Sequence, residues 1–226
     1  MSTNKMPTNK MPTNKMPEYD FKTMDHVKNI INNHAVNFST NPSNYSQYLL
    51  FRLVNPKDLE EFDRDRRSLP TIRLTYNQQS KHLLVKLMPS VLHELAHREL
   101  GREIENALRD MHLPRYALAS VGSGRFKSPR GNSKEGDTCY VPEARSPRGG
   151  HNWPWPSLVL EAGVSESLPQ LRADAAWWFS DSDGDVKITI LIGVDTHCQD
   201  PGPDKLYSTL RWLTSRSSIC AFLAVA

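Results

Sequence analysis

The sequence predicts an α/β fold in which a mixed central sheet is flanked by helices. Three observations support this class: a helical repeat of apolar residues over 90–111, short strand-like runs between 115 and 161, and a second helix followed by an apolar strand at 186–192. The coarse order is therefore helix, three strands, helix, strand. The chain has 226 residues, of which 38% are hydrophobic, which suffices for one core but not for two large domains.

Composition and charge exclude several classes of protein. Lys and Arg number 28 against 25 Asp and Glu, so the net charge of +3 is too balanced for a histone-like nucleic-acid binder. Three widely spaced cysteines argue against a disulfide framework and fit a reducing compartment. The N-terminus is polar, and the longest uncharged apolar run, 219–226, is far shorter than the about 20 residues of a membrane span. We therefore expect an intracellular protein, of the cytoplasm or nucleus, with no membrane partner.

Four segments differ in composition. Residues 1–17 repeat the unit Met-Pro-Thr-Asn-Lys, which is too short and too polar to build a core and predicts a disordered tail. Residues 18–84 are an N-terminal elaboration, and residues 85–193 carry the clearest pattern and form the expected core. Residues 194–226 form a divergent C-terminal segment.

The N-terminal elaboration contains short elements. Residues 27–36 predict a short helix, and 48–54 predict a strand. The charge-dense stretch 57–67 is typical of a solvated helix or loop. Residues 71–76 alternate in polarity and are joined by a polar turn to the apolar run 82–87, which predicts a hairpin.

Both helices of the expected core show terminal signals. Ser90 can cap the first helix, and Leu113-Pro114 ends it. Ser167 can cap the second helix, with Gln170 completing a capping box.

The strands of the core are shorter. Residues 115–121 predict a strand, and 125–128, which follow a Gly-Ser-Gly turn, are expected to pair back. Residues 137–141 predict a further strand, and the apolar run 157–161 predicts a buried one. The last strand is expected at 186–192.

A zinc-binding pattern lies on the first helix. In His93-Glu94-Leu95-Ala96-His97 the two histidines share one face, and the glutamate between them can serve as a base. A zinc peptidase also needs a third protein ligand, which the sequence does not identify. The helical wheel places the histidines at the edge of the apolar face and Glu94 pointing away. The alternative is a buried helix with two hydrogen-bonded histidines.

Two carboxylates lie on neighbouring strands of the expected sheet. Asp137 begins one strand, and Glu161 lies late in the next, where burial of a carboxylate is costly unless it is bound. Such a pair can hold a divalent cation, which neutralises a scissile phosphate and lowers the pKa of its bound water. The alternative is that Asp137 caps a turn and Glu161 pairs with an arginine.

The order of elements and several motifs resemble the restriction endonuclease-like family of the PD-(D/E)XK nuclease superfamily. The similarity covers about residues 85–193, and 171–178 is similar to the fungal branch of that family. The motifs that carry the resemblance are Gly122-Ser123, Phe126-Lys127-Ser128-Pro129, Ser133-Lys134-Glu135-Gly136-Asp137 and residues 156–167.

The resemblance implies a metal-dependent phosphodiesterase that acts on nucleic acid. Asp137, Glu161 and the backbone carbonyl of Ala162 would bind Mg²⁺ or Mn²⁺. The first helix would cover the sheet that bears the carboxylates, so His93 can reach the site.

The chain departs from the family at the catalytic lysine. The superfamily has Lys two residues after the strand glutamate, where this chain has Gly163, and the fungal branch has it at the position of Gln170. Arg172 is the nearest substitute and can stabilise a phosphate or a transition state, but it cannot act as a base. This departure favours a catalytically impaired relative.

Basic and aromatic residues surround the expected site. Trp153 and Trp155 can stack on bases, or they can cover a sheet edge. Six basic residues can contact phosphates or form a solvated loop. These are Arg125, Lys127, Arg130, Lys134, Arg145 and Arg148.

Three functions remain open from the sequence. The first is a metal-dependent nuclease, the second is a non-catalytic module that binds nucleic acid or protein, and the third is a zinc peptidase.

Overall fold

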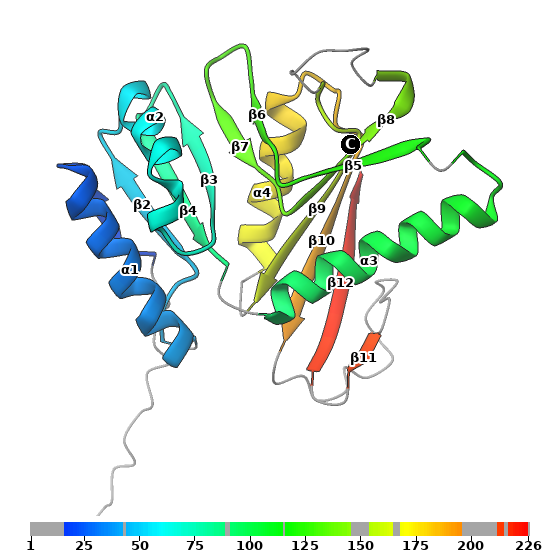
Figure 1. Cartoon of the computed structure of the whole chain (residues 1–226), viewed down its shortest axis with the longest axis horizontal. Helices are drawn as coiled ribbons and strands as arrows, with labels where there is room; N and C mark the ends of the chain where they lie inside the picture. The colour runs from blue at the N-terminus through cyan, green and yellow to red at the C-terminus, as the bar shows by residue number, and fades with distance from the viewer. Residues whose placement is uncertain are drawn as a thin grey trace, which may run out of the picture.

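A computed structural model describes residues 16–42, 44–88, 91–114, 116–145, 154–164, 168–195, 212–214 and 217–225. They form two six-stranded sheets with four α-helices, and the predicted α/β fold with a mixed sheet flanked by helices is confirmed (Figure 1). Residues 1–15 of the expected tail (1–17) and the caps at Ser90 and Ser167 lie outside the described residues.

The first sheet contains mainly N-terminal strands, in the order β1-β2-β4-β3-β7-β6. The predicted hairpin is formed by β3 and β4, which pair in antiparallel fashion. Helices α1 and α2 pack on this sheet (Figure 1). The bounds are β1 Glu18–Asp20, α1 Met24–Thr40, β2 Tyr48–Arg52, α2 Pro56–Arg64, a 3-10 turn Arg66–Ser68, β3 Ile72–Asn77, β4 His82–Leu87, β6 Arg125–Lys127 and β7 Ser133–Glu135.

The second sheet has the order β11-β12-β10-β9-β8-β5. Strands β5, β8 and β9 are antiparallel, whereas β10 runs parallel to β9 after the crossover through α4. The bounds are α3 Val91–Asp110, β5 Leu118–Gly122, β8 Thr138–Pro142, a 3-10 turn Glu143–Arg145, β9 Leu158–Val164, α4 Leu168–Asp181, β10 Ile188–Asp195, β11 Trp212–Thr214 and β12 Ser217–Val225.

Helices α3 and α4 cover opposite faces of the second sheet. Successive side chains of a strand point to opposite faces, and β9 shows this clearly. Leu158 and Leu160 pack with Ala96 and Leu100 of α3, whereas Val159 packs with Trp178 of α4. Glu161, two residues after Val159, therefore lies on the α4 face.

One expectation about strand pairing is wrong. Residues 125–127 do not pair back onto β5: β6 pairs with β7, a strand that the sequence analysis did not predict, and both belong to the first sheet. The boundary placed between residues 84 and 85 falls inside β4. The C-terminal segment contributes to the second sheet, because residues 218–225 of β12 pair with β10.

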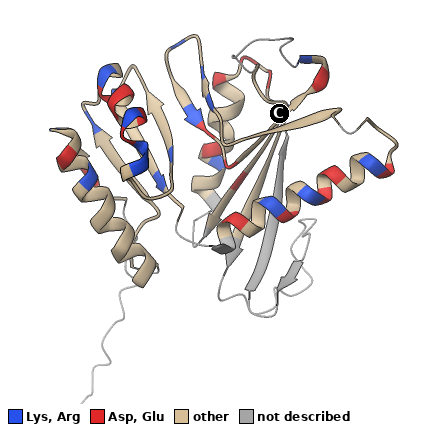
Figure 2. Ribbon diagram, viewed as in Figure 1, with Lys and Arg blue, Asp and Glu red and all other residues tan. Residues whose placement is uncertain are grey.

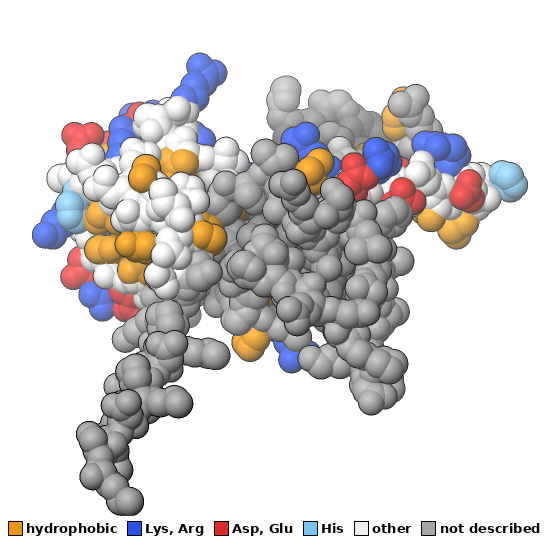
Figure 3. Space-filling view, turned by 90° about the horizontal axis from the view of Figure 1, so that it is seen from below, with side chains coloured by type: hydrophobic (Ala, Val, Ile, Leu, Met, Phe, Trp, Pro, Cys, Tyr) orange, Lys and Arg blue, Asp and Glu red, His pale blue; other side chains and the backbone are white. Residues whose placement is uncertain are grey.

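The described surface carries both charged and hydrophobic side chains. Charges of both signs alternate along α3 (Figure 2), with Glu94 paired to Arg98 and Glu99 to Arg102. Seen from below, hydrophobic side chains gather on the half that holds the first sheet (Figure 3). Within the described part of the chain, no helix has the length and apolar character needed to cross a bilayer.

Candidate functional site

Asp137 and Glu161 lie together where the two sheets meet. Thr138 of β8 pairs with Leu160 of β9, which brings the preceding Asp137 beside Glu161. Both side chains are buried, with exposed fractions of 0% and 1%. The Lys86 ammonium lies 3.3 Å from Asp137 Oδ2 and 3.5 Å from Glu161 Oε2, so one cation from β4 contacts both carboxylates.

Two further cations come from the first sheet. Lys134 Nζ of β7 lies 2.6 Å from Asp174 Oδ1 on α4 and 3.6 Å from Glu161 Oε1. Arg73 Nε of β3 lies 3.6 Å from Asp137 Oδ1. The buried cluster thus contains three carboxylates and three protein cations. We call these six residues the buried charge cluster: Arg73, Lys86, Lys134, Asp137, Glu161 and Asp174.

The surroundings shift the pKa values of Asp137 and Glu161 in opposite directions. Burial acts to raise the pKa of Asp137, but Lys86, His93 and the backbone N–H of Ala162 together hold it well below its usual range. Burial raises the pKa of Glu161, and Lys134 and Lys86 only partly offset that effect. Asp137 is therefore firmly ionised, whereas Glu161 holds a proton more readily.

Lys134 is charged despite its burial. Loss of water acts to lower its pKa, but the carboxylates of Asp174 and Glu161 raise it above its usual value. Lys134 therefore provides a permanent positive charge behind Glu161. Trp178 supports the same carboxylate, because its indole Nε1–H donates to Glu161 Oε1 at 2.7 Å.

Ala162 and His93 complete the surroundings of Asp137. The Ala162 N–H donates to Asp137 Oδ2 at 2.8 Å. His93 Nε2 donates to the Ala162 carbonyl at 2.8 Å and lies 3.2 Å from Asp137 Oδ2. The structure thus places His93 against the carboxylate, with both polar backbone groups of Ala162 directed at this centre.

Gln170 and Arg172 do not bring a cation to the two carboxylates. Arg172 is exposed on α4 and Gln170 is half-buried, and among the described contacts neither side chain forms a hydrogen bond or ion pair with Asp137 or Glu161. Gly163 is buried and has no side chain to offer. The cation beside the carboxylates instead comes from Lys86, which the sequence analysis missed.

An open cleft of about 470 Å³ lies on the α3 side of Asp137. Its walls come from α3, β3, β5 and β8, and they carry both acidic and basic groups. The residues that line it are Arg73, Glu94, His97, Arg98, Gly101, Arg102, Glu105, Ser120, Gly122, Ser123, Asp137, Thr138 and Tyr140. Three arginines therefore approach the space next to an ionised carboxylate.

Six basic residues were expected to flank the cleft, and the five that the structure describes do not line it. Arg125 pairs with Glu135 and Asp63, and Arg145 pairs with Asp185. Lys134 is buried in the charge cluster, and Lys127 and Arg130 are exposed elsewhere. The sixth residue, Arg148, lies outside the described residues.

The structure describes one of the two tryptophans that lie between prolines. Trp155 packs against Phe126, Trp177 and Trp178, with ring centroids 5.8–6.1 Å apart, so it belongs to an aromatic cluster. Trp153 lies outside the described residues.

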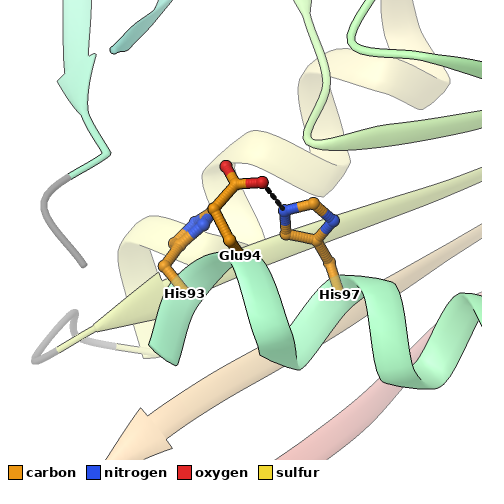
Figure 4. Close-up of side chains that lie close together, drawn as sticks. All are labelled: His93, Glu94 and His97. Atoms are coloured by element: carbon orange, nitrogen blue, oxygen red, sulfur yellow. Dashed lines mark ion pairs between the residues drawn. The ribbon is translucent and has the colours of Figure 1, made fainter. Parts of the chain in front are cut away.

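His93, Glu94 and His97 form a second cluster at the start of α3 (Figure 4). One ligand atom from each residue lies within 4.8 Å of the others. The expectation that Glu94 points away is wrong, because its Oε2 lies 3.6 Å from His97 Nε2. His97 Nδ1 is 2.8 Å from the Thr138 hydroxyl.

Comparison with known proteins adds no function. A scan against models of protein families finds no match, and a search of curated proteins finds no similar sequence. Inferences about activity therefore rest on the geometry of the two clusters.

Proposed function

We propose that the protein is a metal-dependent phosphodiesterase that acts on nucleic acid and has a PD-(D/E)XK-like core. The order α3, β5, β8, β9, α4, β10 supports the fold, with the β6–β7 hairpin inserted between β5 and β8. One observation carries the function: Asp137, directly before β8, and Glu161 of β9 converge on a single buried ammonium. A carboxylate pair with a lysine is the set of groups that this chemistry needs.

The residues present fit a divalent cation. Asp137 Oδ1 is buried and accepts no hydrogen bond within the described part of the chain, and Asp137 lines the cleft. Asp137, Glu161 and the carbonyl of Ala162 are oxygen donors of the kind that Mg²⁺ or Mn²⁺ prefers. When bound, such an ion neutralises charge on the phosphate and lowers the pKa of a water molecule.

The protein's own cations perform the remaining tasks. Lys86 stabilises negative charge next to the carboxylates and takes the place of the lysine absent at Gly163. Lys134 holds Glu161 in place through an ion pair. The two carboxylates are therefore already ordered, and binding does not incur the entropy cost of ordering them. Arg73, together with the other arginines of the cleft wall, can contact phosphates along the strand.

Cleavage assays test this assignment. Purified protein is incubated with labelled single- and double-stranded DNA and RNA, with Mg²⁺ or Mn²⁺ and with chelator. Cleavage should require the metal and should fall at least about 100-fold in Asp137→Asn, Glu161→Gln and Lys86→Met. Lys187→Met, a change of an exposed lysine, is the control and should retain activity. Activity that survives Asp137→Asn would refute the site.

The Arg172→Ala variant separates the two candidate cations. Since Arg172 is exposed and has no described contact with the carboxylates, its loss should leave cleavage within about threefold. Loss of cleavage in Arg172→Ala together with activity in Lys86→Met would assign the cation to α4 instead.

A non-catalytic binding module is the second candidate, and one observation favours it. The buried charge cluster already balances three carboxylates with three cations, so it is complete as a structural ion-pair network. In that case nucleic acid would be bound with an affinity that falls with salt, and no metal would give cleavage.

The zinc-peptidase hypothesis has less support. Glu94 would have to be available as a base, yet it is paired with both His97 and Arg98. Proteolysis of an unfolded substrate that is abolished by Glu94→Gln would support it.

A further inference from the structure

The cluster at the start of α3 adjoins the buried charge cluster through His93, whose Nε2 lies 3.2 Å from Asp137 Oδ2. His93 and His97 are one helical turn apart, so they lie on the same face, and their ring centroids are 5.4 Å apart. Glu94 adds a carboxylate to this pair, and all three ligand atoms lie within 4.8 Å of one another. Glu94 and His97 also line the cleft, which gives an ion a path from solvent.

His97 has a buried nitrogen that forms no hydrogen bond with the part of the chain that the structure describes. Only 3% of the residue is exposed, and its Nδ1 is engaged by the Thr138 hydroxyl. Its Nε2 has no hydrogen bond within the described residues and faces Glu94 at 3.6 Å. A buried polar atom left in this state is destabilising, so a ligand that satisfies it is favoured.

Both imidazoles show the support that metal-binding histidines usually have. A histidine that ligates a metal through one nitrogen generally uses the other in a hydrogen bond that fixes the ring. His93 donates from Nε2 to the carbonyl of Ala162, and His97 is held through Nδ1 by Thr138.

We propose that His93, Glu94 and His97 bind one Zn²⁺ ion in the wall of the cleft. Two imidazoles and a carboxylate are a ligand set typical of zinc, and the three protein ligands leave one position for water or a phosphate oxygen. A tetrahedral site needs ligand atoms roughly 3.3 Å apart, and Glu94, whose side chain is 33% exposed, can rotate to close the difference. The ion adds positive charge to a cleft that already contains three arginines. This site does not depend on the proposed phosphodiesterase activity.

Metal titration of the full chain, without substrate, tests the proposal. Calorimetry with Zn²⁺ should give one ion per chain, and Co²⁺ should produce the intense visible absorption of a tetrahedral site. His97→Ala should abolish this absorption. Because His97 is buried and its removal can unfold the protein, Glu94→Gln, on the partly exposed side of the helix, provides an independent variant. It should weaken Zn²⁺ binding at least tenfold.

Two further variants make the test specific. Thr138→Val keeps the shape of the side chain but removes the hydroxyl that fixes His97, and it should weaken Zn²⁺ binding about 10–100-fold. His112→Asn is the control, because His112 is exposed and Asn tolerates its positive φ of 57°.

Zinc affinity that is unchanged in Glu94→Gln and Thr138→Val, or no stoichiometric binding at all, would overturn the proposal. Glu161→Gln should lose cleavage but keep the cobalt spectrum, so failure of one proposal is distinguishable from failure of the other.

Discussion

Replacement of Lys86 by methionine tests whether the two sheets are joined by charge. Lys86 extends from β4 of the first sheet and contacts Asp137 and Glu161 of the second, at 3.3 and 3.5 Å. Its side chain is 5% exposed, so no water can replace the ammonium without a rearrangement. Methionine has a similar length and removes the charge while it retains most of the packing.

The size of the effect follows from burial. Removal of one partner of a buried ion pair leaves an uncompensated charge and costs about 3–5 kcal/mol. Asp137 has the larger share of this cost, because its pKa lies well below the usual range and it cannot easily accept a proton. For a chain of this size we expect the midpoint of thermal unfolding to fall by about 6–20 °C.

Urea unfolding followed by circular dichroism measures the effect at pH 7. Lys187→Met is the matched control, because Lys187 is exposed, and it should change the unfolding free energy by less than about 0.5 kcal/mol. The double variant Lys86→Met/Asp137→Asn should lose less than the sum of its single variants, because each removes the partner of the other. A loss below about 1 kcal/mol in Lys86→Met would refute the reasoning.

Three further predictions concern residues around the site. The lowered pKa of His97 means that its contribution to stability is present above its ordinary pKa of 6.5 and is lost as the pH falls below it, so His97→Gln should reduce the fall in unfolding free energy between pH 7 and 5. Gly136→Ala should lose about 1–3 kcal/mol in urea unfolding, because a Cβ there would lie 2.7 Å from Cys139 Sγ and 3.1 Å from Trp178. Trp178→Phe removes the donor to Glu161 and should cost about 1.5–3 kcal/mol in thermal unfolding; no change would show that this hydrogen bond adds nothing.

The elements that the sequence predicted well are those with a local pattern. The long helix and the 72–77/82–87 hairpin follow from apolar spacing and a polar turn, and both are observed. Strand β7 has no such pattern, since Ser133-Lys134-Glu135 is polar on both faces. It is a strand only because β3 and β6 lie on either side of it, which depends on tertiary structure.

The sequence predicted the acidic residues at the centre of the candidate site. Asp137 and Glu161 were found because carboxylates next to apolar strands are unusual. Lys86 was missed, and Lys134 was expected only to contact phosphates or to belong to a solvated loop. Both come from strands of the other sheet, and local sequence does not show which sheets meet. A signal did exist: Lys86 lies between Val85 and Leu87 in an apolar strand, and a lysine is buried only when it is paired.

Strand β7 shows why the site needs both sheets at once. Lys134 and Glu135 are consecutive, so their side chains point to opposite faces, and both are buried. Lys134 pairs with Asp174 of α4, whereas Glu135 binds Arg66 and Arg125 in the first half of the molecule, each at 2.7 Å. A buried charge without its partner is costly, so neither half can satisfy this strand alone. The carboxylates of the site are therefore held in place only when the two sheets fold together.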